Sequence, residues 1–289
     1  MSAHAVDACL LFCLLNVPVE HWTPNWPRES TVMVRMASKA VRETVDKMRL
    51  PLDVSSNWHN LFNHRNNLSP QEHCNRAFGQ IRVLSTVCLV TTLKLIDCGL
   101  QGQALQPLAA VLPQCPGLEH LDLSFNGIGD AGLQVVEASI AGCTAIKKLV
   151  VTCNFLGDDG ATRLGSVLAH LTNLEYLDVA RNGISGVGLS SIAQALPHCP
   201  KLSFLFINHN RTANDVESLR HVLPMCQALT MIDVSHTDLG MPGLMCLFEA
   251  MPYLRQMYIH SVGNPDIDFF AGMPVSHQGT DILTVAMVP

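Results

Sequence analysis

The sequence Leu118-Glu-His-Leu121-Asp-Leu123-Ser-Phe-Asn126 returns three more times along this chain, each time in a recognisable variant. The later copies begin at Ile146, Leu174 and Leu202, and each of them ends on an asparagine. The closing residues Asn126, Asn154, Asn182 and Asn210 stand 28 positions apart. A pattern L-x-x-L-x-L-x-x-N at a constant period indicates one supersecondary unit that stacks on copies of itself.

Within each copy the side chains are expected to alternate in direction, as they do in any β-strand. In the first copy Leu121 and Leu123 point into the coil, while His120 and Asp122 point outward. The asparagine follows where the chain leaves the strand, and its amide can bond backbone groups of its own turn and of the neighbouring coil. The sequence therefore predicts a structural ladder formed by Asn126, Asn154, Asn182 and Asn210.

An amphipathic helix is predicted after each strand, because apolar residues recur there at helical spacing. These sets are Leu133, Val136 and Ile140; Leu164, Val167 and Leu168; Leu189, Ile192 and Ala193; and Leu219, Val222 and Leu223. Weaker strand phrases precede and follow, at Leu93, at Ile232 and at Met257, so that seven phrases cover residues 89–262. The loss of detail at both ends is expected, because terminal coils face solvent on one side.

The period and the helix in every unit resemble the ribonuclease-inhibitor-like class of leucine-rich repeats. The resemblance implies an α/β solenoid, a horseshoe with parallel strands on the concave face and helices on the convex face, begun by an N-terminal helical cap. Residues 1–88 are then the cap, 89–262 the repeats and 263–289 a C-terminal cap or tail. The class includes inhibitors, GTPase-activating proteins, ubiquitin-ligase receptors and immune sensors, so the fold alone does not define the function.

Composition and motifs exclude several classes of function. The chain has 289 residues, a net charge of −6 and no basic run, which argues against general nucleic-acid binding. No apolar run reaches the roughly 18 residues of a membrane span. The chain contains no Gly-rich phosphate loop, Cys-x-x-Cys, His-Glu-x-x-His or Gly-x-Ser-x-Gly motif. We therefore expect a non-enzymatic protein with no catalytic residues and no cofactor.

The cysteines follow the repeat rather than a disulfide pattern. Cys115, Cys143, Cys199 and Cys226 occupy one slot at the end of the outer helix. Neighbours in this slot lie about 10 Å apart, which is the distance between packed helices and is too far for a disulfide. Reduced thiols favour the cytoplasm or the nucleus. Asn210-Arg-Thr212 matches a glycosylation acceptor, but Asn210 belongs to the ladder and is expected to point inward.

The first 88 residues do not repeat. Residues Val32 to Val45 resemble the second half of an F-box, with Cys9 to Val17 as the preceding helix. The resemblance implies docking of a Skp1-like adaptor through Leu10, Leu14, Met36 and Val41. The chain departs from that family in lacking an opening Leu-Pro and in having a longer loop, residues 18–29. The alternative is a helical cap that only shields the first coil. A lead-in strand is predicted at Leu50 to Val54.

The outward strand positions form the candidate binding surface. In chain order they are His120, Asp122 and Ser124; Lys148, Val150 and Thr152; Tyr176, Asp178 and Ala180; Phe204, Phe206 and Asn208; Met231, Asp233 and Ser235; and Gln256, Tyr258 and His260. Clustered exposed aromatic and Met side chains mark protein interfaces. The predicted partner-binding set is Tyr176, Phe204, Phe206, Met231 and Tyr258 with His209 and His236. Alternatively, Phe269, Phe270, Met273 and Val275 fold back and cover this surface.

His209 and His236 share one column in adjacent coils, about 5 Å apart by the strand spacing. With His260 they raise the question of a metal site, but no carboxylate or thiol completes the ligand set, so no metal is predicted. The pair is expected to make the surface pH-sensitive below about 6.5. The main prediction is a protein-interaction module. An F-box-type receptor of a Skp1-cullin ubiquitin ligase is the alternative, followed by a GTPase-activating protein or an assembly subunit.

Overall fold

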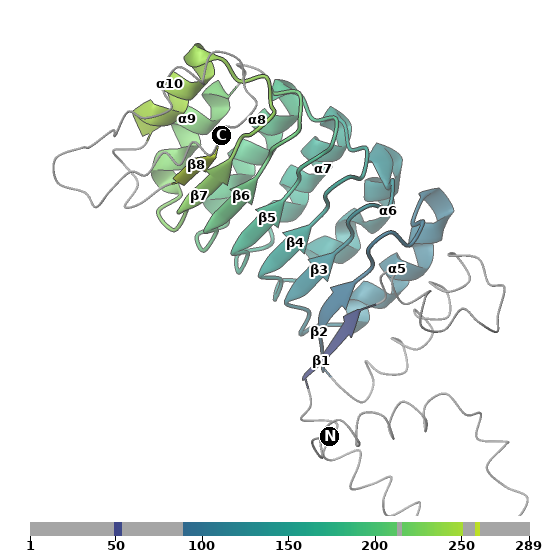
Figure 1. Ribbon diagram of the computed structural model, residues 1–289. Coiled ribbons are helices and arrows are strands. Elements are labelled where there is room, and N and C mark those ends of the chain that lie inside the picture. Colours follow the sequence, from purple (N-terminus) through teal and green to yellow (C-terminus); the bar gives the residue numbers. More distant parts are fainter. Residues whose placement is uncertain (1–48, 54–88, 213–215, 251–257, 261–289) are drawn as a thin grey trace, which may run out of the picture. The chain divides into compact units, whose positions relative to one another are not determined.

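The computed structural model describes residues 49–53, 89–212, 216–250 and 258–260 of this chain (Figure 1). They belong to the larger of the two units into which the chain divides, which begins at Met48. The described strands form one parallel sheet in sequence order. They are β1 (Arg49–Asp53), β2 (Leu89–Lys94), β3 (His120–Asp122), β4 (Lys148–Val150), β5 (Tyr176–Asp178), β6 (Phe204–Phe206), β7 (Met231–Asp233) and β8 (Tyr258–His260).

Helices connect the strands from β2 to β8 and lie together on one side of the sheet (Figure 1). They are α5 (Gln106–Val111), α6 (Gly129–Ala141), α7 (Asp158–Leu168), α8 (Gly186–Ala195), α9 (Glu217–Val222) and α10 (Met241–Ala250). Short 3-10 helices lie at η2 (Gly102–Leu105), η3 (Leu112–Gln114), η4 (Leu196–His198) and η5 (Leu223–Met225). The predicted α/β solenoid is confirmed. None of the described helices is long and apolar enough to cross a membrane.

The register of the sheet follows the sequence period. Leu121 pairs with Leu149, Leu149 with Leu177 and Leu177 with Leu205, each 28 residues further on. The predicted lead-in strand is confirmed as β1, which pairs in parallel with β2 and lies within the range predicted to be the cap.

The predicted register of the last strand is wrong by two residues. The sequence phrase aligned Met257 with Ile232, but in the sheet Ile232 pairs with Ile259 and Met231 pairs with Tyr258. A shift of two residues leaves every side chain on its original face. The alternation of apolar residues therefore fits both registers, and only the pairing of the strands separates them.

The core lies between the sheet and the helices. The inner strand leucines, such as Leu121 and Leu123, are fully buried, and so are the helix residues that face them, such as Val136 and Ile140. All these residues belong to one continuous apolar cluster. Full burial of such a side chain contributes roughly 1.5–3 kcal/mol of transfer free energy. The two sequence periods, two for strands and 3.6 for helices, therefore build one core that runs through successive coils.

The ladder asparagines join neighbouring coils through hydrogen bonds of their amides. The Oδ1 atom of Asn154 accepts from the backbone nitrogens of Asn126 at 3.2 Å and Ile128 at 3.3 Å. Its Nδ2 atom donates to the carbonyls of Leu123 at 2.9 Å and Thr152 at 3.2 Å. The turn therefore buries backbone polar groups that the sheet itself does not pair, and one amide side chain satisfies several of them.

Asn210 occupies the same position two coils later and is only 4% exposed. Its Nδ2 atom, to which a glycan would attach, donates to the carbonyls of Val179 at 3.0 Å and Ile207 at 2.8 Å. The folded chain therefore does not present this nitrogen for modification, as predicted. In the next coil a buried threonine, Thr237, takes the place of asparagine and bonds the carbonyl of Val234 at 2.6 Å.

A second set of contacts between coils caps the helices and was not foreseen from the sequence. Oδ1 of Asp130, in the first turn of α6, accepts from the backbone nitrogens of Gly157 at 2.8 Å and Gly160 at 2.9 Å. These nitrogens are among the unpaired donors at the start of α7. A Cβ atom at Gly160 would collide with this carboxylate and press on Leu156. The close approach of Asp130 and Leu156 therefore disfavours any side chain at position 160.

Asp158 repeats this arrangement one coil later. Its Oδ1 atom accepts from the backbone nitrogens of Ser185 at 2.8 Å and Gly188 at 3.1 Å, and its Oδ2 atom accepts from the Ser185 hydroxyl at 2.7 Å. Burial by itself would raise the pKa of Asp158, but the hydrogen bonds from Ser185 and Gly188 lower it below the ordinary value. The ionised carboxylate is therefore the form that caps α8.

The repeated cysteines are buried at the ends of the outer helices. Cys143, Cys199 and Cys226 carry free thiols. Burial raises the pKa of Cys143 and Cys226 to about 11 and that of Cys199 to about 12. Their sulfur atoms contact backbone carbonyls, as Cys143 does with Leu112 at 3.6 Å. Neutral buried thiols of this kind are poor nucleophiles, so these residues are structural.

Candidate functional site

Three aromatic rings gather on the sheet face that is turned away from the helices, over β5 and β6. Tyr176 pairs with Phe204 in the sheet, and Asp178 pairs with Phe206. The ring centroid of Tyr176 lies 5.0 Å from that of Phe206 and 6.1 Å from that of Phe204, in tilted arrangements. Leu205, between the two phenylalanines, is buried, so alternation along β6 turns both rings to the same side.

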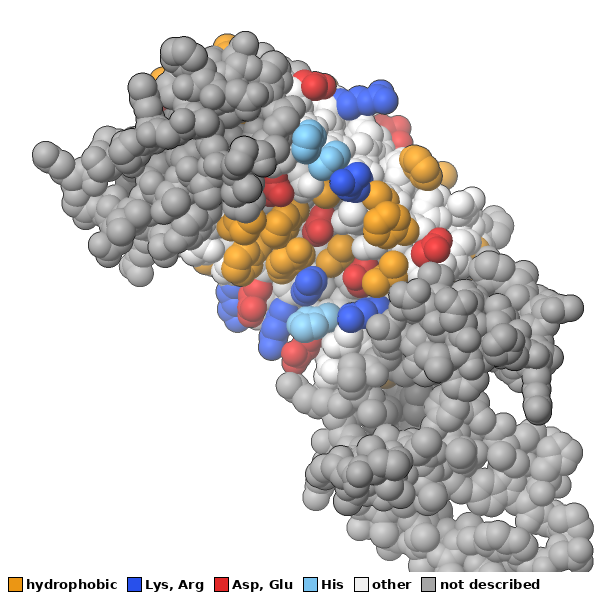
Figure 2. Space-filling view, viewed as in Figure 1, with side chains coloured by type: hydrophobic (Ala, Val, Ile, Leu, Met, Phe, Trp, Pro, Cys, Tyr) orange, Lys and Arg blue, Asp and Glu red, His pale blue; other side chains and the backbone are white. Residues whose placement is uncertain are grey.

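Neighbouring strands extend this group at both sides. The Nζ atom of Lys148 on β4 lies 4.0 Å from the centroid of the Tyr176 ring, a cation–π geometry. Met231 on β7 pairs with Phe204 and is half-buried. Figure 2 shows apolar side chains clustered over these middle strands, with charged groups around them. Tyr176, Phe204, Phe206 and Met231 are called the aromatic cluster below.

The aromatic cluster leaves apolar surface exposed to solvent. Phe204 is 40% exposed, and Tyr176 and Phe206 are partly exposed. The predicted residue Tyr258 is next to Met231 in the sheet register, and its side chain lies outside the described residues. The sheet therefore brings together four of the five predicted apolar contact residues and places the backbone of the fifth beside them.

The aspartates of the strands serve the turns that follow them. Oδ1 of Asp122, Asp178 and Asp233 accepts from the backbone nitrogen two residues further on, at 3.0, 3.0 and 2.9 Å. Burial is the main reason why the pKa of Asp178 is raised, although the hydrogen bond from the nitrogen of Ala180 opposes the shift. These carboxylates stand on separate strands and are engaged by backbone, so they do not form a catalytic pair.

At the third outward position of the strand phrases the surface prediction is wrong for three residues, whereas Thr152 and Asn208 are partly exposed as predicted. Ser124, Ala180 and Ser235 are buried. The strands β3, β5 and β7 are only three residues long, so the alternation of side chains stops after the second outward residue. The turn that follows then covers the next residue. Val150 on β4, which was also predicted to face outward, is buried at 7% exposure. The open surface of the sheet is therefore two side chains wide along β3, β5, β6 and β7 but narrower along β4.

The residue before each ladder position has a left-handed backbone, which the sequence analysis missed. These residues are Asp97, Phe125, Cys153, Arg181, His209 and His236, with φ between 53° and 60°. The backbone nitrogens of the first five bond carbonyls of the next coil, as Arg181 does with Asn208 at 3.0 Å and His209 with Ser235 at 2.8 Å. Positive φ is uncommon outside glycine and is retained here by these contacts between coils. The one available sequence signal is the fixed place before the ladder.

His209 and His236 occupy this left-handed column and face each other. Their ring centroids are 4.4 Å apart and the rings are tilted by 37°. Burial, the positive charge of Arg181 and the nearby ring of His236 lower the pKa of His209 below the ordinary value. Within the described residues no group of three or more His, Cys, Asp and Glu side chains is placed to hold a metal ion.

Two exposed phenylalanines beside the ladder were also missed. Phe125 is 54% exposed and Phe155 is 83% exposed, and both have positive φ, 60° and 56° respectively. They stand directly before Asn126 and directly after Asn154, outside the alternating strand positions. Strand alternation therefore does not identify them.

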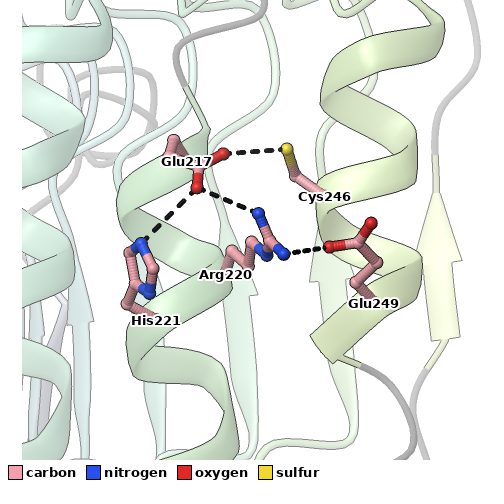
Figure 3. A network of polar contacts seen from close by, with 5 residues as sticks. All are labelled: Glu217, Arg220, His221, Cys246 and Glu249. Atoms are coloured by element: carbon pink, nitrogen blue, oxygen red, sulfur yellow. Dashed lines mark hydrogen bonds and ion pairs between the residues drawn. The ribbon is translucent and has the colours of Figure 1, made fainter.

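A polar network on the helix side links α9 to α10 (Figure 3). Arg220 bonds Glu217 at 3.2 Å and Glu249 at 2.6 Å, and the Cys246 thiol donates to Glu217 at 3.2 Å. The hydrogen bond from Cys246 is the main reason why the pKa of Glu217 is lowered. Burial and this same bond raise the pKa of Cys246, so the thiol is a weak nucleophile. His221 lies 3.4 Å from Glu217. We interpret the network as a contact between two helices.

Several predicted residues lie outside the part of the chain that the structure describes. They are the adaptor-docking residues Leu10, Leu14, Met36 and Val41 and the possible covering residues Phe269, Phe270, Met273 and Val275.

Comparisons with known proteins give a family match and several similar solved structures. A family model described as leucine-rich repeat matches residues 114–136 and 170–193. The leiomodin-1 actin-binding site 2 is 16% identical, with a TM-score of 0.37, over 42% of this chain and 70% of that chain. Internalin C2 from Listeria monocytogenes str. 4b F2365 is 21% identical, with a TM-score of 0.40, over 65% of this chain and 68% of that chain. No curated protein gives a significant match.

The two segments that match the family model correspond to the repeating unit of the structure. Residues 114–136 contain β3, its ladder turn and the first half of α6, and residues 170–193 contain β5, its turn and most of α8. Parallel pairing in a register of 28 residues connects these units with the coils between and beside them. The two matched segments are thus leucine-rich repeats, and they lie within an α/β solenoid.

Proposed function

We propose that this chain is a protein-interaction module without catalytic activity, and that it binds a partner protein over the aromatic cluster. The observation that carries the proposal is the exposure of Phe204 beside the packed rings of Tyr176 and Phe206 on one sheet face. This face corresponds to the concave face of the predicted horseshoe. Assignment to the ribonuclease-inhibitor-like class is part of the same proposal.

The physical properties of the cluster suit recognition. Aromatic side chains contribute large contact areas, and interface hot spots are enriched in Tyr and in other rings that fill pockets of a partner. The backbone of β5 and β6 is held by the sheet, so binding orders little of the chain and loses little conformational entropy. Lys148 adds a charged rim beside Tyr176. The proposed contact region also includes His209 and His236, in the turns that follow β6 and β7.

The test compares capture of partners by the full chain with capture by a Phe204→Ala, Phe206→Ala double variant. A matched control is Met225→Ala, which removes an exposed apolar side chain (65% exposed) that is not part of the aromatic cluster. We expect the double variant to bind the partner with an affinity at least about 30-fold lower, since central aromatic residues contribute about 2 kcal/mol or more to binding. Equal capture by both variants would exclude this surface as the binding site.

The F-box-type receptor is the second function that the sequence supports, through the resemblance of residues 32–45. In that case residues Leu10, Leu14, Met36 and Val41 dock a Skp1-like adaptor, and the aromatic cluster holds the substrate. Co-purification of such an adaptor with the wild-type chain, and its loss in a Leu14→Glu, Val41→Glu variant, tests the adaptor function separately. We further propose a location in the cytoplasm or the nucleus, because the repeated cysteines stand in one slot of successive coils, too far apart for disulfides.

A further inference from the structure

Three basic residues occupy the same left-handed turn position in successive coils. Arg181 follows β5, His209 follows β6 and His236 follows β7, with φ of 53°, 56° and 54°. Arg181 and His236 are exposed, and His209 is half-buried between them. Figure 2 shows two His side chains with a basic side chain close by, along one edge of the apolar patch. These three residues are called the basic edge.

Within the described residues, no ion pair joins the basic edge to a carboxylate. The carboxylates on the same strands, Asp178 and Asp233, accept hydrogen bonds at Oδ1 from backbone nitrogens of the turns. Arg181 and the His236 ring act together with burial to oppose protonation of His209, and only Asp233 favours it. An added anion would relieve this repulsion.

We propose that the basic edge binds a carboxylate of the partner protein, so that the partner presents an aspartate or glutamate beside a large apolar side chain. The apolar half of this inference rests on the proposed function. Phe206 and His209 are three residues apart on one strand and its turn, which spans at most about 10 Å. One extended segment of a partner reaches from the aromatic cluster to the basic edge over that distance.

The charge of the site favours a carboxylate over a phosphate group. Near neutral pH the lowered pKa of His209 leaves that ring uncharged, and the guanidinium of Arg181 carries a permanent charge. One positive charge matches a carboxylate, which guanidinium binds through two parallel hydrogen bonds. Asn208 Nδ2 lies 3.2 Å from His209 Nδ1, and donation by this amide leaves Nε2–H of the neutral ring as a donor.

Acid strengthens the interaction. The charged or titratable groups around His209 are Arg181, His236 and Asp233. In the free protein, Arg181 and His236 oppose protonation of the His209 ring. A bound carboxylate adds a negative charge and therefore raises the pKa of the ring. By linkage, the site then binds the carboxylate more tightly as the pH falls from the pKa of the ring in the complex toward that of the free ring.

The experiment uses the full chain and two small probes, the amidated N-acetyl tripeptides phenylalanyl-glycyl-glutamate and phenylalanyl-glycyl-glutamine. Both probes contain the same phenylalanine ring, and their last side chains have nearly the same shape, but only the glutamyl side chain is negatively charged. NMR signals of the His209 and His236 rings report binding and pKa together. Arg181→Gln is the test variant. Arg211→Gln is the matched control, because it removes an exposed arginine of a nearby turn that is not in the left-handed column.

We expect the glutamyl probe to bind about fivefold more tightly than the glutaminyl probe at pH 7, the upper range for an exposed ion pair. The ratio rises at pH 5.5, and the glutamyl probe raises the pKa of His209. In Arg181→Gln the ratio falls toward one, whereas in Arg211→Gln it is retained. A ratio of one in the wild-type chain, or no binding of either probe, overturns the inference.

Two further measurements show which part of the inference is wrong if the result differs from the expected one. A phosphoseryl probe that binds more than about tenfold tighter than the glutamyl probe would make the basic edge a phosphate site and would contradict a carboxylate, since a single ion pair accounts for at most about fivefold. Phe204→Ala weakens both original probes equally if the ring occupies the aromatic cluster. If this variant has no effect while the glutamyl preference persists, the proposed aromatic contact fails and the basic edge stands.

Discussion

The turns between coils and the open face of the sheet differ in what they repeat. In the turns, Asn126, Asn154 and Asn182 make the same hydrogen bonds one after another, 28 residues apart. On the open face, the position of Lys148 is taken by Tyr176 and then by Phe204 in the next two coils. The turns must satisfy the same buried backbone groups in every coil, whereas the face meets solvent or a partner. Repetition therefore marks structural need, and change marks the surface available for recognition.

The largest effect is expected for Asn154→Ala. This change leaves the buried backbone nitrogens of Asn126 and Ile128 without their acceptor, and each such loss costs about 1–3 kcal/mol. We expect a loss of about 3 kcal/mol or more in the free energy of unfolding, measured by urea titration. Asn173→Ala is the control, because the Asn173 amide bonds near the surface and its loss should cost under about 1 kcal/mol. Equal effects would remove the distinction between turn and surface.

The next effect tests the close approach of two coils. Gly160→Ala places a methyl group against the Asp130 carboxylate and Leu156, and we expect it to cost about 1–3 kcal/mol. Gly142→Ala is the control, because the nearest atom to a Cβ there is 3.5 Å away. The cost at position 160 should shrink in an Asp130→Ala background. If it does not shrink in this double-mutant cycle, the carboxylate is not the obstacle.

A smaller, pH-dependent effect on the free energy of unfolding is expected for Asp158. The folded-state pKa of Asp158 lies below its unfolded value of about 3.9, so its contribution is present above that pH and disappears as the pH falls through the folded pKa. Asp158→Asn should cost about 1 kcal/mol at pH 7, as for loss of a helix cap. The difference between variant and wild type should narrow in urea titrations below pH 4. A constant difference from pH 7 to pH 3 would argue against capping by the ionised form.

The smallest effect on stability is expected for substitutions on the open face of the sheet. Two consecutive residues of β6, one exposed and one buried, allow a direct comparison. Phe204→Ala should change the free energy of unfolding by less than about 1 kcal/mol, because its ring is 40% exposed. Leu205→Ala should cost about 2–5 kcal/mol, because that side chain is fully buried. Similar losses for both, by urea titration, would show that the Phe204 ring is covered in the folded chain.

Much of the fold was predictable because its signals are local and repeated. Leu121, Leu149 and Leu177 stand in register in the sheet as the 28-residue period required, and the helix residues facing them are buried. The candidate site was predictable in part for the same reason. Alternation turned Phe204 and Phe206 to one face, and no further information was needed to place them together with Tyr176.

The missed features depend on contacts between residues far apart in sequence. Asp130 caps a helix 27 residues away, and nothing in its own segment distinguishes it from an ordinary surface acid. The left-handed backbone of Phe125 is retained by a bond to Thr152 in the next coil. The pairing of Ile232 with Ile259 was missed because a two-residue shift preserves alternation.

The periodic positions, taken alone, established that the chain is a parallel-stranded solenoid, that the ladder asparagines hold its turns and that the later coils carry apolar outward residues. Local spacing suffices for these conclusions, because each coil buries the same set of groups. The exposed width of each strand, the left-handed column and the gathering of Arg181, His209 and His236 along one edge came from the packing of coils. Their positions depend on where neighbouring turns place backbone and charge, and a single repeat contains no information about its neighbour's side chains.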